Sequence, residues 1–288
     1  MSFAIEVNNL IKSYGNHTVI NRLSFAVNEG EIFALLGANG AGKTTTLECI
    51  EGIRKYDSGH IKINGTFGVQ LQSSSLPNSI TVLESFKLFC KWNRVNENIE
   101  LLDRFGLIDL KNMQYSAMST GQKRRLHLML ALISNPNVVF LDEPTAGLDV
   151  EGRVSLHKEI RKLKEDGKTI IMASHDMAEV ESLCDRIAIL KDGKIAFTGT
   201  AKELTTNSYL NETKIYIKTL KPLEKYDFKF SSYYGMDQDY LVVVTTKIDD
   251  ALLELLGFSK ETNNNVIDVK IERATLEQRF IEIAKEGK

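Results

Sequence analysis

The feature that most constrains this chain is a glycine-rich segment within residues 31–48, EIFALLGANGAGKTTTLE. An apolar run at residues 32–36 predicts a buried strand, and a helical pattern begins at about Lys43. Between them, GANGAGKT fits G-x-x-x-x-G-K-[ST] at every fixed position. Glycines let successive N–H groups turn toward an anion, and a helix start adds partial positive charge. The segment therefore predicts a nucleoside triphosphate site.

Two side chains of this motif carry the chemistry that a bound nucleotide needs. Lys43 can reach the β- and γ-phosphates, and the Thr44 hydroxyl can bind Mg²⁺. The alternative is a glycine-rich turn with a chance lysine. A full match in the order strand, loop and helix makes that alternative weak.

Length and composition limit the class of protein to which this chain can belong. The chain has 288 residues, a 43% apolar fraction and a net charge of −2, which indicate a soluble chain without a basic field for nucleic acid. Its apolar runs fall short of the roughly 20 residues that span a bilayer, and the first residues do not form a secretory signal. The three cysteines, Cys49, Cys90 and Cys184, lack metal-ligand spacing, so we expect free thiols in a reducing compartment.

Acidic side chains follow a second buried strand. Residues 137–144, NVVFLDEP, predict a parallel strand that delivers two carboxylates to its C-terminal edge, where α/β folds bind ligands. We expect Asp142 to hold Mg²⁺, directly or through water, and Glu143 to act as general base on an attacking water. His175 follows another strand, residues 169–173, and can reach a γ-phosphate from the same edge.

A helix that begins near residue 120 has an unusual first turn. The segment MSTGQKRRL, residues 118–126, places Ser119 at the N-cap and three basic side chains at residues 123–125. The alternative is an ordinary capped helix with a basic first turn, but basic residues at a helix start oppose the macrodipole, so three in a row call for another explanation, such as an anion. It lies in a helical insert, about residues 81–135, which opens on a Thr81–Glu84 capping box.

Together these motifs, in this order, resemble the nucleotide-binding subunit of an ATP-binding-cassette (ABC) transporter over about residues 5–204. The chain is similar to the subfamily of exporters of drugs, peptides, lipids or ions that work with a separately encoded permease. The resemblance implies an α/β fold, with a P-loop NTPase core, an antiparallel β-layer and the helical insert. It also implies ATP and Mg²⁺ as cofactors, and catalysis by Glu143 and His175.

The resemblance assigns further residues one by one. Gln72 falls at the glutamine loop, so the expected metal contacts are Thr44, Gln72 and Asp142, and Asp149 is the D-loop aspartate. Signature residues, which contact the nucleotide of a second subunit in the family, are Ser119, Thr120, Gly121 and Gln122. Nucleotide contacts are implied for Tyr14, Gly37, Ala38, Asn39, Gly40, Ala41, Gly42, Lys43, Thr44 and Thr45.

Some of these assignments depart from the family pattern or have a structural alternative. The signature reads MSTGQ where the family usually has LSGGQ, so Thr120 adds a side chain beside the nucleotide. The stretch at residues 65–72 is short, which favours Gln72 over Gln70. From the residues alone, a tyrosine packed at a strand end is favoured for Tyr14 over a tyrosine that stacks on a base.

The domains are expected at residues 1–205, the ATPase domain, and 206–288, a small α+β accessory domain. Strands are predicted at 214–219, 240–246 and 266–271, with a helix at 249–256 ended by Gly257 and a final helix capped by Thr275. This region has no catalytic constellation, and dimer contact, regulation and membrane-side docking all stay open as its role.

Two classes of function are consistent with the motifs. One is an energy-coupling ATPase for an integral membrane permease, peripheral on the cytoplasmic face of the cell membrane, paired with a second ABC subunit as a homodimer or heterodimer. The other is a soluble ABC-type ATPase that acts on DNA or ribosomes, which usually carries two cassettes or a long coiled coil. This sequence has one cassette, no heptad run and no basic stripe, so we expect the first class and no nucleic-acid partner.

Overall fold

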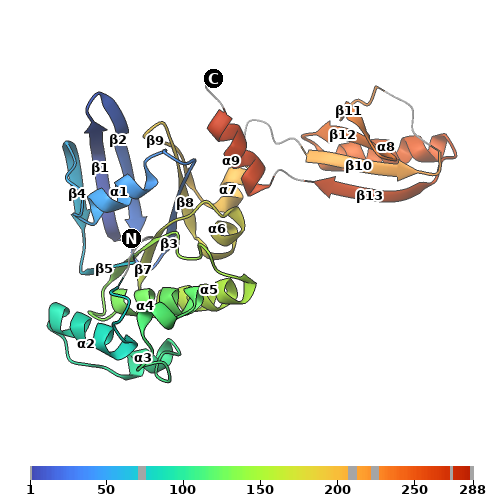
Figure 1. Ribbon diagram of the computed structural model, residues 1–288. Coiled ribbons are helices and arrows are strands. Elements are labelled where there is room, and N and C mark those ends of the chain that lie inside the picture. Colours follow the sequence, from blue (N-terminus) through green and yellow to red (C-terminus); the bar gives the residue numbers. More distant parts are fainter. Residues whose placement is uncertain (1, 71–75, 207–212, 222–226, 273–274, 286–288) are drawn as a thin grey trace. The chain divides into compact units, whose positions relative to one another are not determined.

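The computed structural model describes residues 2–70, 76–206, 213–221, 227–272 and 275–285 (Figure 1). The chain divides into two compact units, Met1–Ala201 and Lys202–Lys288. The expected domain boundary after residue 205 falls inside helix α7 (Ala201–Thr206), close to this division. Gln72, an expected metal contact, lies outside the described residues.

A six-stranded sheet forms the centre of the first unit, with the strand order β5-β6-β7-β3-β8-β9. All its pairs are parallel except β8 with β9. Every residue of β3, β6 and β7 is buried, as expected for parallel strands covered on both faces. The strands are β3 (Ile32–Gly37), β5 (Phe67–Gln70), β6 (Val138–Asp142), β7 (Thr169–Ala173), β8 (Arg186–Lys191) and β9 (Lys194–Gly199).

An antiparallel layer of order β2-β1-β4 stands beside this sheet. Its strands are β1 (Phe3–Tyr14), β2 (His17–Asn28) and β4 (Ser58–Ile63). Helix α1 (Lys43–Ile50) follows the glycine loop, and its Leu47 and Ile50 share one apolar core with both sheets. The predicted α/β class with an antiparallel β-layer is thereby confirmed.

The remaining helices of the first unit are α2 (Val82–Asn93), α3 (Glu100–Arg104), the short 3₁₀ helix η1 (Tyr115–Ala117), α4 (Thr120–Ala131), α5 (Val150–Glu165) and α6 (Met177–Leu183). The predicted capping box of α2 is present, since Glu84 N–H donates to the Thr81 hydroxyl and Thr81 N–H donates to the Glu84 carboxylate. Helix α4 packs directly on β5, where a Cβ on Gly68 would stand 2.0 Å from the Ala131 carbonyl oxygen. Only glycine fits there.

The second unit has a four-stranded antiparallel sheet of order β11-β12-β10-β13. Its elements are β10 (Thr213–Thr219), β11 (Ser232–Asp237), β12 (Tyr240–Thr245), α8 (Ile248–Glu261), β13 (Val266–Glu272) and α9 (Leu276–Lys285). The expected end of the middle helix at Gly257 is wrong. Ala251, Leu255 and Ser259 form one buried stripe, and this packing carries α8 through the glycine despite a helix propensity about 1 kcal/mol poorer than alanine.

Candidate nucleotide site

The glycine loop ends in a backbone conformation that positions the start of α1. Gly42 is the N-cap, with φ 101°, a left-handed value that favours glycine. No side chain caps this end, so its first N–H groups face the loop. The Lys43 ammonium reaches back across the loop and donates to the carbonyl oxygens of Gly37, at 2.7 Å, and Ala38, at 3.4 Å. At the loop tip, Ala38, Asn39 and Gly40 are exposed.

Asp142, at the end of β6, lies beside the first residues of α1. The Thr44 hydroxyl donates to Asp142 Oδ2 at 3.4 Å. Burial, together with the Glu143 carboxylate, raises the pKa of Asp142, and the Thr44 hydrogen bond and the Lys43 charge oppose that rise. Burial lowers the pKa of Lys43, and the carboxylates of Glu143 and Asp142 oppose that shift. The sheet edge thus holds a buried cation next to two carboxylates.

The donor set at this edge fits Mg²⁺. Asp142 is 6% exposed, and its Oδ1 atom has no hydrogen-bond partner among the described residues. Magnesium prefers oxygen ligands and usually keeps several waters while binding one or two carboxylates and substrate phosphates. The described part of the chain has no group of three or more His, Cys, Asp or Glu side chains placed to hold a metal. The Thr44 hydroxyl and the Asp142 carboxylate therefore suit a metal that takes its other ligands from water and phosphate.

Glu143 and His175 meet at the ends of the neighbouring strands β6 and β7. Glu143 has φ 49°, uncommon for a residue with a side chain, and its N–H donates to the Ala173 carbonyl at 3.0 Å. His175 Nδ1 lies 2.8 Å from Glu143 Oε1, and its side chain is 69% exposed against 13% for Glu143. A carboxylate and an imidazole in hydrogen-bond contact can orient and deprotonate a water.

A hydrogen-bond network, buried at Ser174 and exposed at Arg153, fixes the His175 loop on both sides, and the sequence reasoning missed it. Ser174, 1% exposed, donates to Glu179 Oε2 at 2.6 Å. Asp176 caps α6 by accepting from the N–H groups of Ala178 and Glu179, and it also accepts from Arg153 of α5 at 2.9 Å. The Asp176 cap was readable from the sequence, but the Arg153 contact depends on the tertiary fold.

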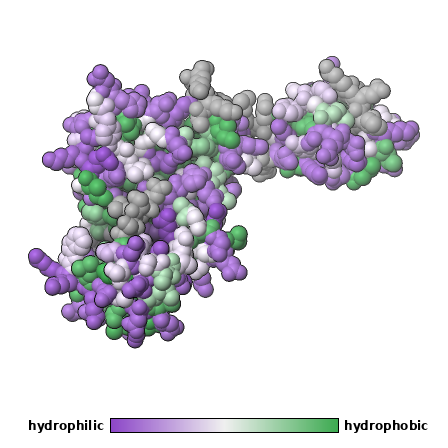
Figure 2. Space-filling model, viewed as in Figure 1, coloured by the Kyte–Doolittle hydropathy of each residue, from purple (hydrophilic) through white to green (hydrophobic). Residues whose placement is uncertain are grey.

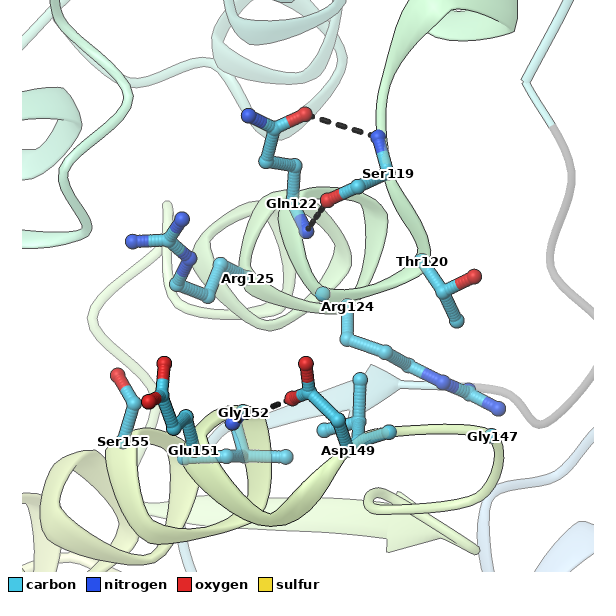
Figure 3. A pocket seen from close by; sticks show the side chains of 13 residues that line it. Ser119, Thr120, Gln122, Arg124, Arg125, Gly147, Asp149, Glu151, Gly152 and Ser155 are labelled. Atoms are coloured by element: carbon cyan, nitrogen blue, oxygen red, sulfur yellow. Dashed lines mark hydrogen bonds between the residues drawn. The ribbon is translucent and has the colours of Figure 1, made fainter.

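The signature segment forms the start of α4 and borders a separate cavity (Figure 3). Ser119 is the N-cap as predicted, since its hydroxyl accepts from Gln122 N–H at 3.3 Å while Gln122 Oε1 accepts from Ser119 N–H at 2.8 Å. Across the cavity, Asp149 caps α5 by accepting from Gly152 N–H at 2.8 Å. The cavity is about 510 Å³ and is lined by residues 119–122, 124, 125, 147–149, 151, 152, 155 and 156.

Thr120, the departure from the usual signature, lies against the turn before α5. A Cβ built on Gly147 would be 3.7 Å from the Thr120 methyl carbon, which is ordinary van der Waals contact. Arg124 of the same helix donates to the Ala146 carbonyl at 3.4 Å. The signature helix and the D-loop are therefore joined within one chain.

Tyr14 lies at the end of β1 and is 44% exposed, so it is not buried at the strand end. Lys12 Nζ stands 5.2 Å and Arg54 Cζ 5.5 Å from the centre of its ring. An exposed aromatic face flanked by cations suits an adenine with phosphates attached.

Proteins of similar sequence show which family this site belongs to. The sequence profile of the ABC transporter family matches residues 20–146. An uncharacterized ABC transporter ATP-binding protein of Methanocaldococcus jannaschii is 36% identical over 231 residues, which cover 77% of this chain and 88% of that protein. The chain belongs to the ABC transporter ATP-binding proteins.

Two further likenesses extend this ABC assignment. Nod factor export ATP-binding protein I of Paraburkholderia xenovorans is 37% identical over 219 residues, 70% of this chain and 72% of that protein. A solved ATP-binding subunit of an ABC transporter superposes with a TM-score of 0.65 at 27% identity, covering 72% of this chain and 93% of that one. As an ABC cassette, the chain binds ATP and hydrolyses it to power transport. No helix in the described ranges has the length and apolarity needed to cross a membrane.

The sequence did not predict the burial of two polar side chains of the cassette. Glu51, just after α1, is 8% exposed, and burial, with help from Asp142 and Glu48, raises its pKa to about 7. Gln70, at the end of β5, is 1% exposed, and both atoms of its amide lack a hydrogen-bond partner in the described residues. Neither has a local sequence signal, because burial at these points depends on how the layers pack.

Proposed function

We propose that this ABC ATPase powers export through a separate membrane permease, as one of two cassettes that share two nucleotide sites. The observation that carries the proposal is the separation of two phosphate-facing elements. Lys43, Asp142, Glu143 and His175 gather at one sheet edge, whereas the described residues that line the signature cavity all come from 119–125 and 147–156. A cassette of this kind needs a partner to bring a signature segment to its nucleotide.

In the proposed site, each side chain has one task. Lys43 and the N–H groups at the start of α1 bind the phosphates, and the exposed ring of Tyr14 stacks on the base. Thr44 and Asp142 hold Mg²⁺, and Gln72 is proposed as a further metal contact. When bound, Mg²⁺ supplies positive charge that offsets the charge on the phosphate oxygens.

Glu143 and His175 complete the hydrolytic step. Glu143 accepts a proton from the attacking water, whose oxygen forms a bond to the γ-phosphorus as the bond to the β-phosphate bridge oxygen breaks. His175, in contact with Glu143 at 2.8 Å, orients that carboxylate and reaches toward the γ-phosphate. Ser119 and Gly121 of the partner cassette provide the opposite wall.

We also propose where the two domains lie and how the cassettes pair. Residues 1–205 act as the ATPase domain and residues 206–288 as an accessory domain, on the cytoplasmic face of the membrane against the permease. Export is supported by the similarity to Nod factor export ATP-binding protein I. The pair of cassettes is a homodimer or a heterodimer.

A mixing experiment tests the shared site. A Lys43→Ala chain and a Ser119→Arg chain are each inactive alone, but a mixed dimer recovers one complete site. Random mixing should restore up to about a quarter of the parent ATPase rate, because half of the dimers are mixed and each retains one of two sites. If mixed dimers form, as shown by differently tagged chains, and no activity returns at any ratio, the shared-site mechanism is wrong.

A further inference from the structure

Helix α2 presents an outer face that the nucleotide site does not use. Leu88 and Trp92 lie one helical turn apart on this face, and these residues are 48% and 76% exposed. Lys87 and Lys91 are also exposed and one turn apart, along the adjacent stripe, and Arg94 follows at the C-cap. We call these five residues the α2 outer face.

The tryptophan is held in its exposed position. Phe89, which is half-buried, stands with its ring centre 6.0 Å from that of Trp92, in a tilted contact. The opposite side of the helix is fixed in the core by Val82, Phe86 and Cys90. The helix is thus anchored on one side and offers a supported indole on the other. Figure 2 shows apolar and polar surface intermixed in the region of α2 and α3.

The three charged side chains of the α2 outer face are all basic, and the acidic side chain on the same stripe, Glu84, lies one turn before Leu88. In the described ranges, none of the ion pairs involves Lys87, Lys91 or Arg94. Two copies of this face would therefore repel each other. The area of two apolar side chains is also far smaller than the roughly 800 Å² per partner that a standard stable protein interface buries. An exposed Trp and Leu beside several cations instead match the polar–apolar boundary of an anionic bilayer, where tryptophan is enriched and basic residues gain from the surface potential.

We propose that the α2 outer face contacts the surface of an anionic membrane, with Trp92 and Leu88 entering the headgroup layer and Lys87, Lys91 and Arg94 facing lipid phosphates. This inference rests on the proposed placement of the cassette at the membrane. It adds a direct lipid contact to the attachment that a permease provides. A single weak contact suits a subunit that is already held nearby, because a second attachment raises the effective concentration of the first.

The sequence supplies an unusually specific probe for this contact. Trp92 is the single tryptophan of the chain, so intrinsic tryptophan fluorescence reports on the α2 outer face alone. The full-length protein is titrated with phosphatidylcholine vesicles that contain or lack phosphatidylserine. We expect a blue shift of the emission with the anionic vesicles, a weaker one with neutral vesicles, and loss of the difference in high salt.

Two matched double variants separate this face from general charge. Lys87→Glu with Lys91→Glu should weaken binding to anionic vesicles by well over tenfold, since each basic residue near such a surface changes the partition constant about fivefold. Lys158→Glu with Lys162→Glu changes the net charge equally, at the same spacing, on exposed positions of α5. That control should bind nearly as the parent does. Trp92→Ala, followed by vesicle flotation, should reduce binding to neutral and anionic vesicles alike.

The outcomes are separable from those of the proposed function. An unchanged Trp92 emission with anionic vesicles, or an equal loss of binding in the α5 control, overturns the inference. A shift seen only with the purified permease and never with vesicles also overturns it, in favour of a protein contact. ATPase activity and the mixing experiment do not involve these residues, so they test the shared site independently.

Discussion

Replacing Glu51 by Gln should stabilise the first unit, and only at neutral and alkaline pH. Glu51 is 8% exposed and its Oε2 atom has no partner among the described residues, so ionisation is unfavourable in the folded chain. Its pKa rises from 4.5 to about 7 on folding. Gln keeps the size of the side chain and removes the charge.

The sign of the effect follows from the direction of that shift. Well below pH 4.5 the Glu51 carboxyl is protonated in both the folded and unfolded chains, so its ionisation does not change the free energy of unfolding. As the pH rises toward 7 the unfolded chain releases this proton more readily, so folding stability falls. The raised pKa of Glu51 lowers the free energy of unfolding by about 3 kcal/mol at pH 8 and by under about 1 kcal/mol at pH 5. For a unit of this size, about 3 kcal/mol raises Tm by roughly 6–12 °C.

Thermal unfolding of nucleotide-free protein, followed by Trp92 emission, gives the measurement, because Trp92 lies in the first unit. Glu51→Gln should melt well above the parent at pH 8 and near it at pH 5. Glu97→Gln, an exposed position, serves as control and should stay within about 2 °C at both. An equal Tm for Glu51→Gln and parent at pH 8, or the same gain at both pH values, would refute the reasoning.

Three further predictions concern the nucleotide. Lys43→Ala should lose ATP binding, because in this loop only Lys43 brings charge to the phosphates; unchanged affinity by calorimetry would contradict the loop assignment. Glu143→Gln should keep ATP binding and accumulate a closed dimer, while the hydrolysis rate falls by about 10²–10⁴; a near-parental rate would exclude Glu143 as the base. Tyr14→Phe should preserve ATP affinity and Tyr14→Ala should weaken it, with little discrimination between ATP and GTP. Equal affinities for the parent and Tyr14→Ala would leave Tyr14 without a role in binding.

Features with a local cause were predictable from the sequence. The strand, glycine loop and helix around Lys43 follow from short-range pattern, and so do the capping boxes at Thr81, Ser119 and Thr275. Each of these signals depends on residues only a few positions apart. The same holds for the α/β alternation of the first unit.

Features that depend on distant residues were not predictable. Strand β11 has no alternation of apolar and polar residues, and it exists because β12 supplies its hydrogen bonds. The Arg153–Asp176 contact joins two helices, and the burial of Glu51 and Gln70 results from stacked layers. Sequence reasoning placed Glu143 and His175 at one sheet edge, but their contact became visible only in the fold.

The close approach of Gly68 to Ala131 has a mechanical consequence for the signature segment. With no side chain between them, the C-terminal end of α4 is pressed against β5, so relative motion there is small. The N-terminal end lies a helix of 12 residues away, about 18 Å, and its contacts with the turn before α5 are the long Arg124 hydrogen bond and the van der Waals contact of Thr120. A tilt of about 10° around the fixed end would move Ser119 by about 3 Å, the length of a hydrogen bond. A small rotation of α4 about its contact with β5 would therefore be enough to make or break the phosphate contacts proposed for Ser119.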